Sequence, residues 1–320
     1  MCGIVYTRRT DGKPARKSVL KQYRRQEDRG NEGFGYVAID DTRTITDYKR
    51  TQTEEGARKA LATTSAPHIL FHHRFPTSTI NVPESAHPIV IQHAELKYTY
   101  YVTHNGVIQN PAELHAEHIA NGYKYSTEVK SLYQTANGVM YHGEANYNDS
   151  EALAIEIART IEGLQSTVRA TGTIAYIVLQ TLAGKVIATY YGTNGGNPLT
   201  MRAGKTGITI ASEGGSPIVD NIAYRLDAET SEITIASVPL SYAQPMGYGF
   251  NRPYDLAGEW EDELADYEAE DIAERIAEID INIKLASECE ELEELDELVA
   301  ERNSLTAELI DRRATKRFAF

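Results

Sequence analysis

Cys2 stands directly behind the initiator Met1 and before the small residue Gly3. When Met1 is removed, Cys2 becomes the first residue and carries both a thiol and a free α-amino group. Such an amine has a pKa of about 7.7 to 8.0, so it can accept the thiol proton near neutral pH without a separate histidine. Because nucleophiles activated in this way are known in catalysis, the sequence predicts covalent catalysis at Cys2. A retained Met1 would mask this nucleophile.

Short β-like runs punctuated by Gly, Pro and Asn fill residues 1–240 and predict the elements that must position Cys2. Helices are expected at 17–27 and at 149–161, where apolar residues recur at helical spacing. Because the strands cluster between helices, the order favours a layered α+β domain over alternating βαβ units. The expected strands are 3–7, 35–39, 68–71, 98–103, 173–179, 186–191 and 207–211.

The net charge of −14 comes from one acidic segment. Residues 259–301 hold nineteen Asp and Glu against Arg275 and Lys284, so the remaining chain is nearly balanced. Gly and Pro mark a linker at 241–258, and both are absent from 259–320, where an apolar stripe predicts an acidic amphipathic helix or helical hairpin. We expect this extension to mediate homo-oligomer formation or the docking of a partner.

Composition excludes several classes of protein. The basic stretch 8–25 is typical of a solvated helix face, so no nucleic-acid partner is expected. No apolar run is long enough to span a bilayer, and no secretory signal opens the chain, so no membrane association is expected. The only cysteines are Cys2 and Cys289, which argues against a disulfide framework and favours a cytoplasmic protein.

Several further segments carry residue types suited to amide chemistry. They read FHHRFPTST at 71–79, THNGVIQN at 103–110 and NDSEALA at 148–154. Together with Met1-Cys2-Gly3 and the segment DRGNEGFG at 28–35, their order and spacing resemble class II glutamine amidotransferase domains, which are N-terminal-nucleophile hydrolases. The resemblance covers about residues 1–235. It implies a four-layer αββα sandwich, to which the acidic helical extension would be appended.

The resemblance implies that Asn105 and Gly106 form an oxyanion hole. Thiolate attack on an amide creates an oxyanion, and a side-chain N–H with a backbone N–H can stabilise it. Here the pair is expected in a turn after a strand. The alternative is a plain hairpin turn, because Asn-Gly is a strong turn signal.

The resemblance also implies residues that bind the head group of free glutamine. Arg74 corresponds to the arginine that holds the α-carboxylate, Thr77 lies at the hydroxyl position of the same loop, and Asp149 corresponds to the carboxylate that meets the α-ammonium. The alternatives are a structural ion pair for Arg74 and a helix N-cap for Asp149. The segment 126–129 looks similar to the Asp149 motif but lacks the Asp, and choosing Asp149 implies an insertion at 111–148.

Other residues of these motifs receive supporting roles. Arg29, Gly30 and His87 are expected to support the N-terminal strand and the pocket. His72 and His73 are adjacent, so on a strand they point to opposite faces, and with His87 they lack the spacing of a zinc site. No metal and no cofactor is therefore expected.

Three functions remain open from the sequence. The first is a glutamine-hydrolysing amidotransferase subunit that acts on L-glutamine and supplies ammonia to an acceptor enzyme on another chain, since residues after 240 leave no room for an acceptor domain. The second is an amidohydrolase that acts on another γ-glutamyl or peptide amide. The third is an inactive binding or structural protein on the same fold.

Overall fold

The computed structural model describes residues 2–75, 82–129 and 147–241, all of which belong to a compact unit spanning Met1–Met246. The expected linker beyond residue 241, the acidic extension 259–320 and Thr77 lie outside the described residues. The domain boundaries predicted at 240 and 258 therefore stay predictions.

Two antiparallel sheets form the centre of the domain. The seven-stranded sheet contains, in spatial order, β11 (Ser216–Pro217), β9 (Thr200–Gly204), β10 (Gly207–Ala211), β1 (Gly3–Arg9), β4 (His68–His73), β2 (Phe34–Ile39) and β3 (Ile45–Thr51). The six-stranded sheet contains, in spatial order, β13 (Ile233–Ala236), β12 (Ala223–Asp227), β8 (Lys185–Thr193), β7 (Gly172–Leu182), β6 (Thr99–Ile108) and β5 (Ile89–Ile91). The antiparallel pairing confirms an α+β domain without βαβ units.

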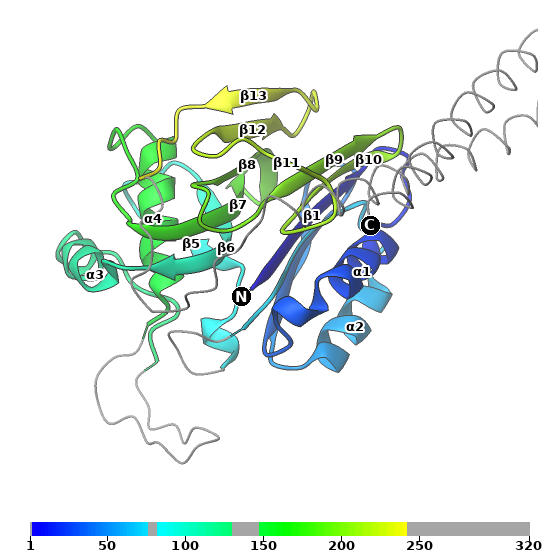
Figure 1. Cartoon of the computed structure of the whole chain (residues 1–320), viewed down its shortest axis with the longest axis horizontal. Helices are drawn as coiled ribbons and strands as arrows, with labels where there is room; N and C mark the ends of the chain where they lie inside the picture. Colours follow the sequence, from blue (N-terminus) through cyan, green and yellow to red (C-terminus); the bar gives the residue numbers. More distant parts are fainter. Residues whose placement is uncertain (1, 76–81, 130–146, 242–320) are drawn as a thin grey trace, which may run out of the picture. The chain divides into compact units, whose positions relative to one another are not determined.

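Helices cover the outer faces of both sheets (Figure 1). The α-helices are α1 (Arg16–Arg25), α2 (Glu54–Thr63), α3 (Pro111–Ala120) and α4 (Asp149–Ile161), and two 3-10 turns are η1 (Glu27–Arg29) and η2 (Pro83–Ser85). Among the helices of the described residues, none is both long and apolar enough to cross a membrane.

The side chains of β1 show how the layers are built. Ile4 and Tyr6 pack between the two sheets with residues of β7 such as Ile177, whereas Val5 points to the opposite face and packs with α1 and α2. A third core joins α4 to the outer face of the six-stranded sheet. This alternation along the central strand β1, which is buried from Gly3 to Arg8, gives the layer order helix, sheet, sheet, helix. The predicted four-layer αββα sandwich is thereby confirmed.

The expected strands and helices are present, and most strands are longer than predicted. Helix α4 has the predicted bounds, whereas the helix expected at 17–27 ends earlier, at Arg25, and continues as η1. The prediction of a turn at Asn105-Gly106 was wrong, because β6 runs without interruption to Ile108. Strand β7 pairs with β6 along its whole length, and this pairing overrides the local turn preference of Asn-Gly.

Candidate active site

Cys2 is fixed at the start of the central strand β1. Its backbone carbonyl accepts a hydrogen bond of 3.1 Å from Arg29 Nε, and Arg29 is itself paired with Glu213 at 2.6 Å. Next to Cys2, the His73 ring fills the space beside Gly3, where an added Cβ would lie 1.8 Å from Nε2. Only glycine fits this approach, which explains why the nucleophile is followed by Gly3.

The surroundings of Cys2 keep its thiol neutral at rest. Burial raises the pKa of Cys2, while the Phe75 N–H, 3.5 Å from Sγ, and the nearby charge of Arg74 oppose that rise. The Cys2 backbone N–H donates to Asn105 Oδ1 at 3.1 Å. Because the resting thiol holds its proton, attack on a substrate requires a base in direct reach of Sγ.

The orientation of the Asn105 amide leaves one polar atom open. Since Oδ1 accepts from Cys2, the Nδ2 group is directed elsewhere, and among the described residues it has no hydrogen-bond partner although the side chain is 1% exposed. An unpartnered buried donor is energetically unfavourable in a folded protein unless a ligand or water meets it. Its position beside the nucleophile suits a substrate oxygen that gains negative charge.

A second donor lies on the open edge of β6. Strand β5 pairs only as far as Val102, and among the described residues no strand pairs with the edge of β6 beyond it. On that edge His104 N–H donates to His87 Nδ1 at 3.2 Å, and Ile108 N–H donates to Asp149 Oδ2 at 2.8 Å. Gly106 lies midway between them, so the alternation of strand N–H groups directs its own N–H to the same edge.

The partner strand supports this orientation of Gly106. Ile174, which lies opposite Gly106, exchanges hydrogen bonds with Asn194 on its far side, at 2.9 Å and 3.0 Å. The Gly106–Ile174 pair is therefore a pair without cross-strand hydrogen bonds. The N–H of Gly106 and the side-chain amide of Asn105 consequently belong to one region next to Cys2.

Arg74 and Asp149 bring opposite charges to this region. Both side chains are buried, and each alters the pKa of Cys2: the Arg74 charge lowers it and the Asp149 charge raises it. Burial lowers the pKa of Arg74, and the charges of Cys2 and Asp149 oppose that shift. A buried guanidinium and a buried carboxylate near one thiol can meet the two charges of an amino-acid head group.

No family model matches the chain. Its sequence is similar to glutamine–fructose-6-phosphate aminotransferases [isomerizing], with 29% identity over 172 residues for the Corynebacterium diphtheriae protein and 32% over 131 residues for the Aquifex aeolicus protein. These matches cover 51% and 40% of this chain but only 27% and 21% of the relatives. The chain thus spans about a quarter of the curated relatives that it matches.

Two solved structures share the fold over most of the chain. One is the glutamine phosphoribosylpyrophosphate (PRPP) amidotransferase from B. subtilis complexed with ADP and GMP, with 17% identity, 74% of this chain and 49% of that chain covered, and a TM-score of 0.53. The other is described as the allosteric regulatory enzyme of purine biosynthesis, with 17% identity, 75% and 50% coverage and a TM-score of 0.54. The domain shares the fold of these two structures.

Asp149 is not the N-cap of α4, which was the alternative interpretation of its position. The cap is Asn148, whose Oδ1 accepts from Ser150 N at 3.0 Å. Asp149 occupies the first helical position, where the helix dipole favours a negative charge. The competing segment at 126–129 contributes Ser126 and Thr127, whose N–H groups donate to Glu151 at 2.7 Å and 2.8 Å. That segment therefore stabilises the first turn of α4 through Glu151.

The supporting residues take structural positions around the predicted site. Gly30 lies against Arg74, where an added Cβ would be 2.4 Å from the Arg74 carbonyl carbon. The His87 ring lies tilted against the His72 ring, with 4.2 Å between the ring centroids, whereas His73 faces the other side of β4 and contacts Tyr23 at 5.0 Å. The opposite directions of His72 and His73 agree with the alternation expected of a strand. Within the described ranges, no three His, Cys, Asp or Glu side chains gather as a metal site.

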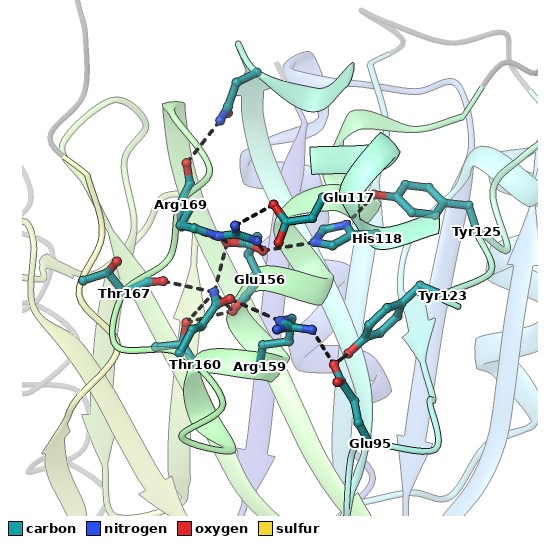
Figure 2. A network of polar contacts seen from close by, with 12 residues as sticks. Glu95, Glu117, His118, Tyr123, Tyr125, Glu156, Arg159, Thr160, Thr167 and Arg169 are labelled. Atoms are coloured by element: carbon teal, nitrogen blue, oxygen red, sulfur yellow. Dashed lines mark hydrogen bonds and ion pairs between the residues drawn. The ribbon is translucent and has the colours of Figure 1, made fainter. Parts of the chain in front are cut away.

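A polar network that the sequence did not indicate lies further along α4 (Figure 2). Glu156 is fully buried, and its carboxylate accepts from His118 Nε2 at 3.0 Å, from Arg169 Nη2 at 2.7 Å and from Gln165 Nε2 at 2.9 Å. These donors hold the pKa of Glu156 down, at about 2, despite its burial. The only sequence signal was a glutamate within the apolar run of α4, and its partners are distant in the chain.

Proposed function

We propose that the amidotransferase domain hydrolyses L-glutamine with Cys2 as the nucleophile. The observation that carries this proposal is the Asn105 amide, which accepts from the Cys2 backbone nitrogen and keeps its buried Nδ2 group unpartnered beside the thiol. The sequence relatives support glutamine as the substrate, since their names describe glutamine-dependent aminotransferases.

The reaction begins once removal of Met1 has freed the Cys2 amine. The amine takes the thiol proton, Sγ forms a bond to the side-chain amide carbon of glutamine, and the carbonyl π electrons move to oxygen. Asn105 Nδ2 and the Gly106 N–H stabilise that oxyanion. When the oxyanion collapses, the C–N bond breaks, and the nitrogen leaves as ammonia with the proton from the Cys2 ammonium. Water then attacks the γ-glutamyl thioester, which yields glutamate and restores the thiol.

The head group is proposed to bind between two buried charges. Arg74 would hold the α-carboxylate of glutamine, with Thr77 near it, and Asp149 would meet the α-ammonium. Charge at both ends selects a free amino acid over a peptide amide, because a peptide bond offers neither a carboxylate to Arg74 nor an ammonium to Asp149. The ammonia is proposed to serve an acceptor enzyme on another chain in the cytoplasm, and the residues 259–320 are the proposed docking or self-association segment.

The test uses the full chain and measures glutamate and ammonia release from glutamine together with the intact mass. We expect loss of Met1, a single adduct with a diazo-ketone glutamine analogue, and loss of both adduct and activity in Cys2→Ala. Cys289→Ala is the matched control, and it should keep both. A hydrolysis screen in which another amide outperforms glutamine would contradict the proposed substrate. A chain that retains Met1 and takes no label would contradict the catalytic proposal.

A further inference from the structure

We infer that His104 is a positioning residue that fixes the oxyanion edge of β6 against the N-terminus of α4, using Ser150 and Thr173 as its two anchors. This inference rests on the proposed function. It states that His104 increases the rate of the chemical step by holding the oxyanion donor in place. It does not assign His104 contact with the substrate.

The His104 ring is held at both nitrogens. Ser150 Oγ lies 2.9 Å from Nδ1, and the Thr173 carbonyl oxygen lies 3.1 Å from Nε2. A carbonyl oxygen can only accept, so Nε2 carries the proton and Nδ1 accepts from the Ser150 hydroxyl. Burial lowers the pKa of His104, which keeps this neutral form stable. The ring is 1% exposed and therefore acts as a rigid bridge from β6 to both α4 and β7.

The same ring determines the position of Gly106. A Cβ placed on Gly106 would lie 2.6 Å from His104 Nε2 and 1.8 Å from the Thr173 carbonyl oxygen. Gly106 thus packs directly on the His104–Thr173 hydrogen bond, and its φ of 152° is rarely adopted by side-chain-bearing residues. Any shift of the ring or of Thr173 would move the Gly106 N–H, which is the proposed oxyanion donor.

The bridge also joins two parts of the proposed substrate site. Ser150 directly follows Asp149, whose carboxylate accepts from Ile108 N–H on the edge that carries Gly106. His104 N–H and Ile108 N–H therefore flank Gly106 with contacts that lead, through His87 and Asp149, to the start of α4. The Asp149 carboxylate and the Gly106 N–H are consequently held at a fixed distance from each other. This fixed geometry favours the transition state over a loosely bound substrate.

The test compares kcat and KM for glutamine in His104→Asn, His104→Gln and Ser150→Ala. The Gln amide reaches the position of Nε2 and can still donate to Thr173, whereas the Asn amide is too short. We expect kcat to fall about 100-fold in His104→Asn, about 10-fold in His104→Gln and several-fold in Ser150→Ala, since small misplacements carry penalties of about 10²-fold. KM should stay within about threefold, because Arg74 and Asp149 remain in place.

His118→Gln is the matched control. His118 is also fully buried and bonded at both nitrogens, to Tyr125 and Glu156, but it lies in the network away from Cys2. It should lower the melting temperature and leave kcat unchanged at temperatures where the protein is folded. The rate of Cys2 labelling by the diazo-ketone analogue provides a second readout, and it should fall in the same order as kcat.

The outcomes separate this inference from the proposed function. Variants of His104 that keep wild-type kcat, or that lose kcat only in proportion to stability as His118→Gln does, would overturn the positioning role while the glutaminase proposal stands. A rise in KM at constant kcat would also overturn it. Wild-type protein that neither hydrolyses glutamine nor takes the label overturns the proposed function, and the inference with it.

Discussion

Helix α4 borders two buried polar regions that differ in how completely their hydrogen bonds are made. At its N-terminal end, the Asn105 amide has a buried Nδ2 without a partner among the described residues. Further along, the Glu156 carboxylate accepts five hydrogen bonds, which come from His118, from Gln165 and three times from Arg169. One region keeps a donor open, whereas in the other both carboxylate oxygens of Glu156 accept hydrogen bonds.

The difference indicates what each region is for. The buried carboxylate of Glu156, with its five hydrogen bonds, ties α3, α4 and the segment before β7 together (Figure 2). An open buried donor carries a desolvation penalty that only an incoming group can relieve. The completely bonded network can therefore stabilise the helix layer on which Asp149 and Ser150 depend, while the open region is suited to a substrate.

The largest expected effect comes from removing the open donor. In Asn105→Ala, kcat for glutamine should fall about 10² to 10³-fold, because one oxyanion donor is lost. The free energy of unfolding should fall by only about 1 kcal/mol in the same variant, because Oδ1 loses a single hydrogen bond, from the Cys2 N–H, and Nδ2 has no partner among the described residues. Steady-state kinetics and thermal unfolding check both statements. A large loss of stability with unchanged kcat would reverse the assignment of the two regions.

The region around Cys2 was predicted from the sequence, whereas the network around Glu156 was not, because it depends on contacts between distant residues. Cys2, Asn105 and Asp149 were identified by their motifs, and the structure brings them together with Arg74. The role of α4 as a helix followed from its apolar spacing. The strand conformation of Asn105-Gly106 did not follow, because pairing with β7 about seventy residues later decides it.

Local preference also failed to identify the cap of α4. Asn148 and Asp149 are equally good caps by type, and only the backbone geometry places Asn148 outside the helix. His104 gave no sign of its anchors, since Ser150 and Thr173 lie 46 and 69 residues away in the chain. Buried polar networks are specified by such long-range contacts, so a single sequence names their members without showing which of them meet.

The second prediction concerns a substitution that removes the acceptor at the centre of the Glu156 network. In Glu156→Ala, the free energy of unfolding should fall by about 3 kcal/mol, because His118, Gln165 and Arg169 lose their common acceptor. Both kcat and KM for glutamine should stay within about twofold at temperatures where the variant is folded. Chemical denaturation with parallel kinetics tests this. A kcat loss as large as that of Asn105→Ala would show that the two regions are not separate in function.

The third prediction concerns how the free energy of unfolding depends on pH through Glu156. The pKa of Glu156 is lowered from about 4.5 to about 2 in the folded protein by its hydrogen bonds to His118 and Arg169, which outweigh the effect of burial. A lowered folded-state pKa contributes stability above the unfolded pKa, and that contribution is lost as pH falls toward 2. The shift corresponds to about 3 kcal/mol.

Comparison with Glu156→Gln isolates this carboxylate from all other acidic groups. The stability difference between wild type and variant should be constant above about pH 5 and should shrink steadily as pH falls from there toward 2. Denaturant titrations at a series of pH values measure it. A difference that stays constant down to pH 2 would show that Glu156 titrates normally and that the network does not hold its charge.

The smallest effect is expected at the edge of the same network. Arg159 pairs with Glu95 at 2.5 Å, and the Glu95 side chain is 32% exposed, so water screens the pair and can replace it. Arg159→Ala should therefore lower the free energy of unfolding by about 0.5–1 kcal/mol, and the loss should shrink in high salt. Arg169→Ala, which removes two side-chain donors from the buried Glu156, should have a clearly larger effect that salt changes less. Equal losses of stability in the two variants would contradict this prediction. They would show that neither burial nor the number of hydrogen bonds makes the centre of the network more important for stability than its edge.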